Sequence, residues 1–491
     1  MAKNPADRPR SSPLDPADWP AFRREARALL DQSIDRLEHA GDGPVWQPMP
    51  DRVQASLAIP SPVEPTPVER LRHELVESIL PYATGNTHPR FWGWVHGTGT
   101  AGGMLAEMAS AAINANCGGR NHGAIELERI VVGWACSWFG LPASAGGLLV
   151  SGSSMANLYG IAIARHHKAG HDIRAKGNAG VPLVAYASKE GHLSVSKAFE
   201  LIGLGREALR TIPTDAGLRM DLTALKTAIA ADRSAGRKPF CVIASAGTVN
   251  SGVFDDLAGL ADLCAAEGLW LHVDGAFGAM VALAPELAPL VAGIERADSI
   301  TFDYHKWLHV PYDAGCILVR DQALQIDVFG GRPDYLAASG GLASGEPWPS
   351  DLGIELSRSF RALKVWWTLR EQGTRRLGEA IARNCAQARL LESLLRCHDI
   401  IEIAAPVSLN IVCCRYRPPG LDDAALDDLN ARIVVAIQES GVAVPSTCRI
   451  AGRLCIRVCI TNHRSRDDDF ALLTDAILSA GKRAFSQITA A

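Results

Sequence analysis

The central part of the chain alternates short apolar segments with longer segments in which apolar residues recur at helical spacing. The short segments indicate buried strands, and the amphipathic segments between them, such as 155–168 and 256–267, indicate helices. The predicted strands cover residues 183–187, 240–244, 270–273, 299–302 and 316–319. Strands separated by helices favour an α/β domain built on a mainly parallel sheet.

The two ends of the chain show different patterns. Residues 21–40 and 68–80 have the spacing of amphipathic helices, and four prolines within 58–67 predict an extended connection. This N-terminal part has too little apolar material for a strong core, so we expect an arm that packs on another body, such as a second subunit. The C-terminal part mixes strands at 409–415 and 454–460 with helices, which indicates a separate α+β unit.

These patterns predict three parts: an arm at residues 1–85, a large domain at 86–375 and a small domain at 376–491. Within the large domain, segment 329–353 is rich in Gly, Pro and Ser and has little apolar pattern. Because long irregular loops in compact domains are usually functional, we expect this segment to be a lid.

Composition excludes several classes of function. Hydrophobic residues make up 47% of the 491 residues, and a net charge of −4 gives no basic excess for nucleic acid or a membrane surface. The N-terminus has no apolar signal segment, and no run of about 18 apolar residues predicts a membrane span. The twelve cysteines include no CxxC pair and no zinc-ligand spacing. We therefore expect a reduced, cytoplasmic protein without a metal site.

Two residues suited to catalysis lie at the ends of predicted strands. Asp274 ends the run LWLHVD, and Lys306 follows the run SITFDYH. Taken singly, Asp274 is explained as well by a helix N-cap, and Lys306 by a surface lysine. Their separation of 32 residues is one strand–helix–strand step, which places both at the same sheet edge. A lysine that can form a Schiff base, with a carboxylate for a pyridinium nitrogen, is what pyridoxal phosphate requires.

That cofactor also requires a phosphate site. Segment 151–157, SGSSMAN, opens a predicted helix after a short strand, and helix N-terminal N–H groups and hydroxyls bind phosphate. Ser153 and Ser154 are the candidate ligands, with His305 as a further donor, although a plain serine N-cap explains the segment equally well.

In combination, these motifs resemble the group II pyridoxal-phosphate decarboxylases, which include the aromatic-L-amino-acid, glutamate, histidine and cysteine-sulfinate decarboxylases. The resemblance rests on HVDGAFGA at 272–279, ADSITFDYHKW at 297–307 and PDYL at 333–336, and it extends from HPRFWGW at 88–94 to LCIRVCITN at 454–462. It implies fold type I, the aspartate-aminotransferase-like α/β arrangement, with a mainly parallel sheet of about seven strands and a smaller C-terminal α+β domain. It also implies a homodimer with shared active sites, pyridoxal 5'-phosphate as cofactor, and conversion of an L-amino acid to its amine and CO2.

The resemblance implies a role for each matching residue. Lys306 would be the Schiff-base lysine, Asp274 would pair with the pyridine nitrogen, and His192 would stack on the cofactor ring. Tyr335 in the lid would protonate Cα after CO2 leaves, and Arg457 would lie near the substrate carboxylate. The further cofactor contacts that it implies are Ser153, Ser154, Ser245, Ala276, Asp303 and His305.

The segments that match the family's substrate pocket leave the substrate class open. Trp94 suits an aromatic side chain, whereas His96, Asn114 and Asn116 make the region more polar than a phenyl or indole pocket needs. Asn114 and Asn116 match positions that relatives supply from the second subunit. An aromatic substrate is favoured by similarity, and an acidic or polar amino acid stays an alternative.

Two other functions are compatible with the fold. Oxidative, aldehyde-forming relatives replace the lid tyrosine or the stacking histidine, and this chain has both Tyr335 and His192. A fold-retaining binding protein would have lost Lys306 or Asp274, and both are present. We therefore predict an amino-acid decarboxylase, a carboxy-lyase.

Overall fold

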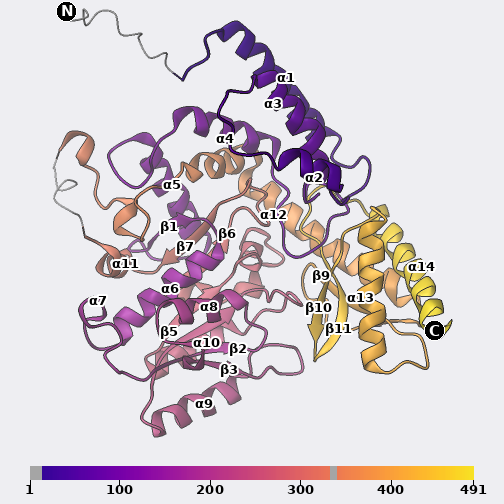
Figure 1. Cartoon of the computed structure of the whole chain (residues 1–491). Coiled ribbons are helices and arrows are strands. Elements are labelled where there is room, and N and C mark those ends of the chain that lie inside the picture. The colour runs from indigo at the N-terminus through magenta and orange to yellow at the C-terminus, as the bar shows by residue number, and fades with distance from the viewer. Residues whose placement is uncertain (1–13, 332–339, 491) are drawn as a thin grey trace, which may run out of the picture.

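The computed structural model describes residues 14–331 and 340–490, and its largest element is a seven-stranded sheet (Figure 1). The strands lie in the spatial order β1-β7-β6-β5-β4-β2-β3. Their bounds are β1 (Gly146–Val150), β2 (Leu183–Ser188), β3 (Leu209–Ile212), β4 (Lys238–Ser245), β5 (Trp270–Asp274), β6 (Ser299–Asp303) and β7 (Gly315–Val319). Strands β3, β2, β4, β5 and β6 pair in parallel, whereas β7 is antiparallel to both β6 and β1. The expected mainly parallel sheet is confirmed.

Both faces of the sheet are covered by helices, which explains why its central strands read as continuous apolar runs. In β4, Val242 faces a hydrophobic cluster formed with α5, α9 and α10, and Ile243 faces a second cluster formed with α6 and α8. The helices of the large domain are α4 (Ala101–Ile113), α5 (Gly123–Trp138), α6 (Ser153–Lys168), α7 (Ile173–Lys176), α8 (Leu193–Leu201), α9 (Leu222–Ser234), α10 (Leu257–Glu267) and α11 (Gln322–Phe329).

Local signals set the helix ends that matter for the site. Helix α10 begins where the Asp256 side chain accepts a hydrogen bond from Gly259 N at 3.0 Å, and it ends at Gly268 in the left-handed region (φ 65°). The strand that follows therefore starts at Trp270 and ends at Asp274. The neighbouring parallel strands end at Ser245 and Asp303, so these polar side chains meet at one sheet edge.

A second, smaller sheet forms the C-terminal part, as expected. It is antiparallel, in the order β10-β11-β9-β8, and α13 and α14 pack on it around a separate hydrophobic cluster. These elements are β8 (Ile401–Ile403), β9 (Ile411–Tyr416), α13 (Asp423–Glu439), β10 (Ser446–Ile450), β11 (Arg453–Cys459) and α14 (Asp468–Ala490). The long helix α12 (Arg361–Arg396) leads into this part and is interrupted at Gly373 (φ 70°, ψ 150°). The domain boundary at 375/376 stays a prediction and falls just after this break.

The N-terminal arm contains α1 (Trp19–Glu38), α2 (Asp51–Leu57) and α3 (Val68–Glu74), and none of the residues in these helices is buried. Trp19, Leu57 and Leu71 are among its exposed apolar side chains. Helix 68–80 is shorter than predicted: α3 ends at Glu74, and a π-helical turn and a 3₁₀ turn containing Pro81 follow. The thin core expected for this part is confirmed.

The cysteines and the apolar character of the helices bear on two expectations from the sequence. All twelve cysteines are free thiols, as expected, and Cys397 is the exposed one. In the part of the chain that the structure describes, no helix combines the length and apolar character needed to span a membrane.

Candidate active site

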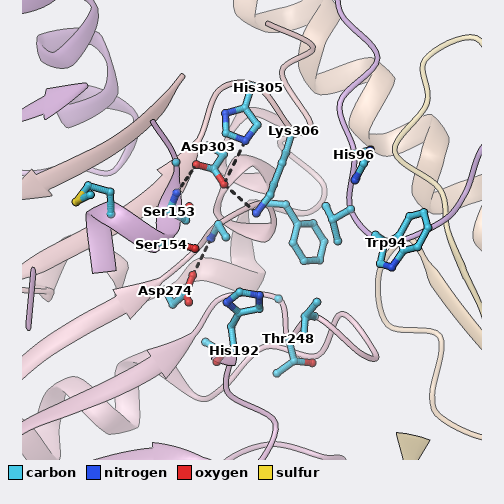
Figure 2. A pocket seen from close by; sticks show the side chains of 18 of the residues that line it. Trp94, His96, Ser153, Ser154, His192, Thr248, Asp274, Asp303, His305 and Lys306 are labelled. Atoms are coloured by element: carbon cyan, nitrogen blue, oxygen red, sulfur yellow. Dashed lines mark hydrogen bonds and ion pairs between the residues drawn. The ribbon is translucent and has the colours of Figure 1, made fainter. Parts of the chain in front are cut away.

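A cavity of about 530 Å³ opens at the sheet edge where β4, β5 and β6 end. It brings together side chains from the ends of these strands, from the start of α6 and from the segment before α4 (Figure 2). Eleven of the residues predicted from the sequence line this cavity: Trp94, His96, Ser153, Ser154, His192, Ser245, Asp274, Ala276, Asp303, His305 and Lys306.

Lys306 projects into the middle of the cavity from the turn after β6 (Figure 2). Its Nζ lies 2.8 Å from Asp303 Oδ2. Burial lowers the pKa of Lys306, but the charge and hydrogen bond of Asp303, together with Asp274 and Tyr312, outweigh burial, so the pKa of Lys306 lies above its ordinary value. In this form the amine is a charged, paired group, and it becomes a nucleophile when it gives its proton away.

The Asp303 carboxylate contacts two other groups besides Lys306. Its Oδ1 accepts a hydrogen bond from Ser153 N at 2.7 Å, and His305 Nε2 lies 3.7 Å from Oδ2. His305 Nδ1 accepts from Ala314 N at 3.0 Å, which fixes the ring. Burial lowers the pKa of His305, so the ring is neutral at pH 7 and Nε2 carries its proton.

The start of α6 has the chemistry of a phosphate site. Ser153 is buried, yet its Oγ has no hydrogen-bond partner among the described residues, and Ser154 faces the cavity beside it. A buried hydroxyl without a partner is rare, because it loses its bonds to water. The N-terminus of a helix adds N–H groups and a positive dipole end. These groups fit the phosphate of the expected cofactor.

Asp274 is held by a chain of buried polar groups that sequence reasoning missed. Its Oδ2 accepts from Asn157 Nδ2 at 2.8 Å, and Asn157 Oδ1 lies 2.9 Å from His272 Nε2. His272 Nδ1 in turn lies 2.8 Å from Ser299 Oγ. Burial lowers the pKa of His272 to about 4, so this ring stays neutral.

Room for the His272 ring comes from a glycine. A Cβ on Gly160 would lie 2.5 Å from His272 Cε1, so any larger residue at this point of α6 would force the ring or the helix to shift. Asn157 and Gly160 are one turn apart on the same helix, and both face β5. A polar residue and a glycine at this spacing inside an apolar helix are the signal that the sequence offered.

His192 begins α8 and faces the cavity. Ser194 N donates to His192 Nδ1 at 3.2 Å, which leaves Nε2 as the protonated nitrogen. Ser194 Oγ also accepts from Asn157 Nδ2 at 3.0 Å. Asn157 therefore bonds both to Asp274 and to the serine that contacts His192. Burial lowers the pKa of His192.

The wall beyond Lys306 is mainly aromatic and apolar. Trp94, Val95, Val249 and Phe277 line it, and Trp94 is 53% exposed. The His96 ring lies among Phe91, Trp94 and Tyr312, with centroids 5.5 to 6.1 Å away, and Trp94 and His96 lie together in Figure 2. Burial, followed by the charge of Lys306, lowers the pKa of His96. Glu190, Thr248 and Tyr312 also line the cavity and were missed from the sequence.

Of the other four predicted residues, Arg457, Asn114 and Asn116 do not line this cavity. Tyr335 lies outside the described residues. Arg457 is buried, and its guanidinium donates to three backbone oxygens, those of Trp94 (2.8 Å), Val249 (2.6 Å) and Asn250 (3.2 Å). Arg457 therefore holds together the two cavity-lining segments that contain Trp94 and Val249, without lining the cavity itself.

Asn114 and Asn116 are exposed on the surface of the chain. Asn114 ends α4 in the left-handed region (φ 48°). Asn116 Oδ1 accepts from Arg358 N at 3.0 Å and from Gly118 N at 3.0 Å. In a single subunit these two residues are therefore parts of a surface turn.

Known proteins resemble this chain in sequence and in fold. The family model described as "Pyridoxal-dependent decarboxylase conserved domain" matches residues 50–417. An aromatic-L-amino-acid decarboxylase of Bacillus atrophaeus is 36% identical over 91% of this chain and 93% of its own length. A phenylacetaldehyde synthase of Petunia hybrida is 28% identical over 92% of this chain and 91% of its own. A crystal structure of Oryza sativa TDC with PLP and tryptamine superposes with a TM-score of 0.88 at 26% identity, covering 96% of this chain and 99% of that one.

The α/β fold and the lysine–carboxylate cavity define an enzyme that uses pyridoxal phosphate, and the chain belongs to the pyridoxal-dependent decarboxylase family. It is a pyridoxal-phosphate-dependent amino-acid decarboxylase. When bound, the cofactor supplies an aldehyde that reacts with amines and a ring that accepts the electron pair left by departing CO2.

Proposed function

We propose that this enzyme converts an aromatic L-amino acid to its amine and CO2, and that it does so as a homodimer. The charge of the cavity is the observation that carries the choice of substrate. Among the described lining residues, Asp274, Asp303 and Glu190 are acidic, and none is an arginine. Lys306 is the one lysine among them, and Asp303 already pairs with it.

An acidic substrate side chain would be repelled in such a cavity, because it would meet carboxylates without a free cation. The lining histidines do not supply that cation, since burial lowers the pKa of His96, His192 and His305. Trp94 and Phe277 instead offer the flat apolar surface that an aromatic ring packs on. The 36% identity with an aromatic-L-amino-acid decarboxylase supports the same choice.

The roles we propose for the site follow from its contacts. The Lys306 amine holds the cofactor aldehyde, the Asp274 carboxylate holds a proton on the ring nitrogen, and Ser153 and Ser154 bind the phosphate. Asn157 keeps the Asp274 carboxylate turned toward the cavity. We propose Tyr335 as the acid that protonates Cα, and His192 as the ring that packs on the cofactor.

A homodimer is supported by apolar surface without a partner within the described chain. Met108 and Ile113 on α4 are more than half exposed, at 55% and 57%, and the arm adds Trp19 and Leu71. Because Asn114 and Asn116 follow α4 directly, the same surface would bring them to the partner's cavity. The free thiols fit a reducing compartment, and the cytoplasm is the location we propose.

The test is a comparison of substrates with purified enzyme saturated with pyridoxal phosphate. We expect CO2 release from L-tryptophan, L-tyrosine or L-phenylalanine with a kcat/KM at least about a hundredfold above that for L-glutamate or L-cysteine sulfinate, which corresponds to ~3 kcal/mol of discrimination. Equal or higher kcat/KM for an acidic substrate would refute the proposal. Light scattering of the same sample gives the subunit number.

The oxidative relatives provide a second candidate function, since a phenylacetaldehyde synthase is among the similar proteins. In that reaction the amino acid, O2 and water give aldehyde, CO2, ammonia and hydrogen peroxide. Because Tyr335 and His192 are both present, we propose the non-oxidative reaction. Oxygen uptake and peroxide in amounts equal to CO2 would overturn this choice.

A further inference from the structure

The last turn of α6, at the opposite end from the phosphate site, carries two adjacent histidines, His166 and His167. Helix α11 packs beside α6 (Figure 1), and both histidine rings contact it. His166 Nε2 lies 3.0 Å from Asp327 Oδ2 on α11, and His167 Nε2 lies 2.9 Å from the backbone oxygen of Leu324. None of these residues takes part in the decarboxylase site.

One ligand atom from each of His166, His167 and Asp327 lies within 4.8 Å of the other two. In a tetrahedral zinc site with bonds of about 2.0–2.1 Å, neighbouring ligand atoms are roughly 3.3 Å apart. The rings of two histidines bound to one such ion are then separated by roughly 5 Å between centroids. The centroids of His166 and His167 are 5.0 Å apart, with the ring planes at 78°.

The two histidine rings are packed in place before any ion binds. His167 stacks on Trp270 at 6.3 Å and 11°, and the His166 side chain is only 12% exposed. Asp327 is 63% exposed, which gives an ion a path from solvent. The backbone oxygen of Leu324 lies next to the same group and can act as a further oxygen ligand.

We propose that His166, His167 and Asp327 bind one divalent transition-metal ion of the Zn²⁺, Co²⁺ and Ni²⁺ class. Two imidazoles and a carboxylate suit these ions rather than Mg²⁺ or Ca²⁺, which prefer oxygen ligands alone. The bound ion would tie α11 to the end of α6, whose other end lines the cofactor cavity. Cysteine spacing could not reveal this site, because it contains no cysteine and is formed by residues about 160 positions apart.

One feature of the site limits its affinity. His166 Nδ1 is buried and has no hydrogen-bond partner among the described residues. An ion on Nε2 leaves a proton on Nδ1 that nothing accepts, so we expect micromolar rather than nanomolar binding.

The experiment is a calorimetric titration of the full chain, loaded with pyridoxal phosphate, with CoCl2. Wild type should bind one ion per chain that the Asp327→Asn variant does not bind, or binds at least about tenfold more weakly. His167→Gln should show the same loss, and the exposed Asp327→Asn decides the matter if His167→Gln fails to fold. His171→Gln is the matched control, because His171 is a nearby, partly buried histidine that bonds to Gly177 O.

Visible spectra of the cobalt complex add a second readout that does not depend on activity. The d–d bands of a nitrogen- and oxygen-ligated ion should appear in wild type and in His171→Gln and be absent in Asp327→Asn. Equal stoichiometry and affinity in wild type and Asp327→Asn, or no saturable binding by wild type, would overturn the proposal. Because the cofactor site shares no residue with this one, failure here leaves the decarboxylase assignment untouched.

Discussion

Asn157 is the residue whose replacement tests the site geometry most sharply. Its Nδ2 donates to Asp274 Oδ2 at 2.8 Å and to Ser194 Oγ at 3.0 Å, and its Oδ1 lies 2.9 Å from His272 Nε2. Asn157→Ala removes all three contacts while adding no charge. We expect the Asp274 carboxylate to lose its fixed orientation toward the cofactor ring.

The size of the effect follows from the bond that is lost. A hydrogen bond to a charged group contributes roughly 1.5–3 kcal/mol. If the whole free energy of the hydrogen bond to Asp274 stabilises the transition state, its loss should lower kcat/KM by roughly 10- to 100-fold. Asn157→Asp keeps the shape but places a second carboxylate against Asp274, so its loss should be at least as large.

A buried asparagine elsewhere provides the control. Asn430 is fully buried in the small domain, where it bonds to backbone groups of Tyr416 and Leu426. Asn430→Ala and Asn157→Ala should both lower the free energy of unfolding by about 1–3 kcal/mol. Only Asn157→Ala should lower kcat/KM, measured as CO2 release at saturating cofactor. Unchanged kcat/KM in Asn157→Ala, or an equal loss in both variants, would show that the reasoning is wrong.

Three further predictions concern the surroundings of the site. Gly160→Ala should lower the free energy of unfolding by about 1–3 kcal/mol, because the new Cβ would lie 2.5 Å from His272 Cε1. Urea denaturation measures this loss, and a variant as stable as the wild type would contradict the prediction. Burial lowers the pKa of His272 from 6.5 to about 4, so between these pH values the unfolded chain takes up a proton at His272 that the folded chain does not. The free energy of unfolding should therefore fall by up to about 3 kcal/mol as the pH drops from 6.5 to 4. His272→Gln should remove that part of the slope in urea unfolding at a series of pH values, and parallel curves would refute it. Arg457→Met should weaken binding of both the amino acid and the product amine by about tenfold, since Arg457 bonds to Trp94 O and Val249 O; loss for the amino acid alone would instead assign it to the substrate carboxylate.

The sequence indicated the sheet edge correctly because buried parallel strands are apolar throughout and then end on polar residues. Asp274 and Lys306 were found in this way, and β5 and β6 do lie side by side. Strand β3 was missed because it is the outermost strand of the sheet. Its residues LRTI are mostly only partly buried and show no apolar run.

The polar network behind Asp274 could not be predicted in the same way. His272 lies in the middle of an apolar strand and is 115 residues away from Asn157, so nothing in the local pattern joins them. Arg457 shows a related limit: its position near the cavity follows from the family motif, whereas the backbone oxygens that it contacts are set by tertiary packing. Pairing of distant polar groups requires the fold.

The measurement that bears most directly on this account is reduction of the cofactor-loaded enzyme with borohydride, followed by peptide mass mapping. We expect a visible absorption band that borohydride removes, and a pyridoxyl phosphate mass on the peptide containing Lys306. Lys306→Ala should show neither the band nor the label, and it should release no CO2. A label on a different lysine, or no label after added pyridoxal phosphate, would contradict the assignment of this cavity as the cofactor site.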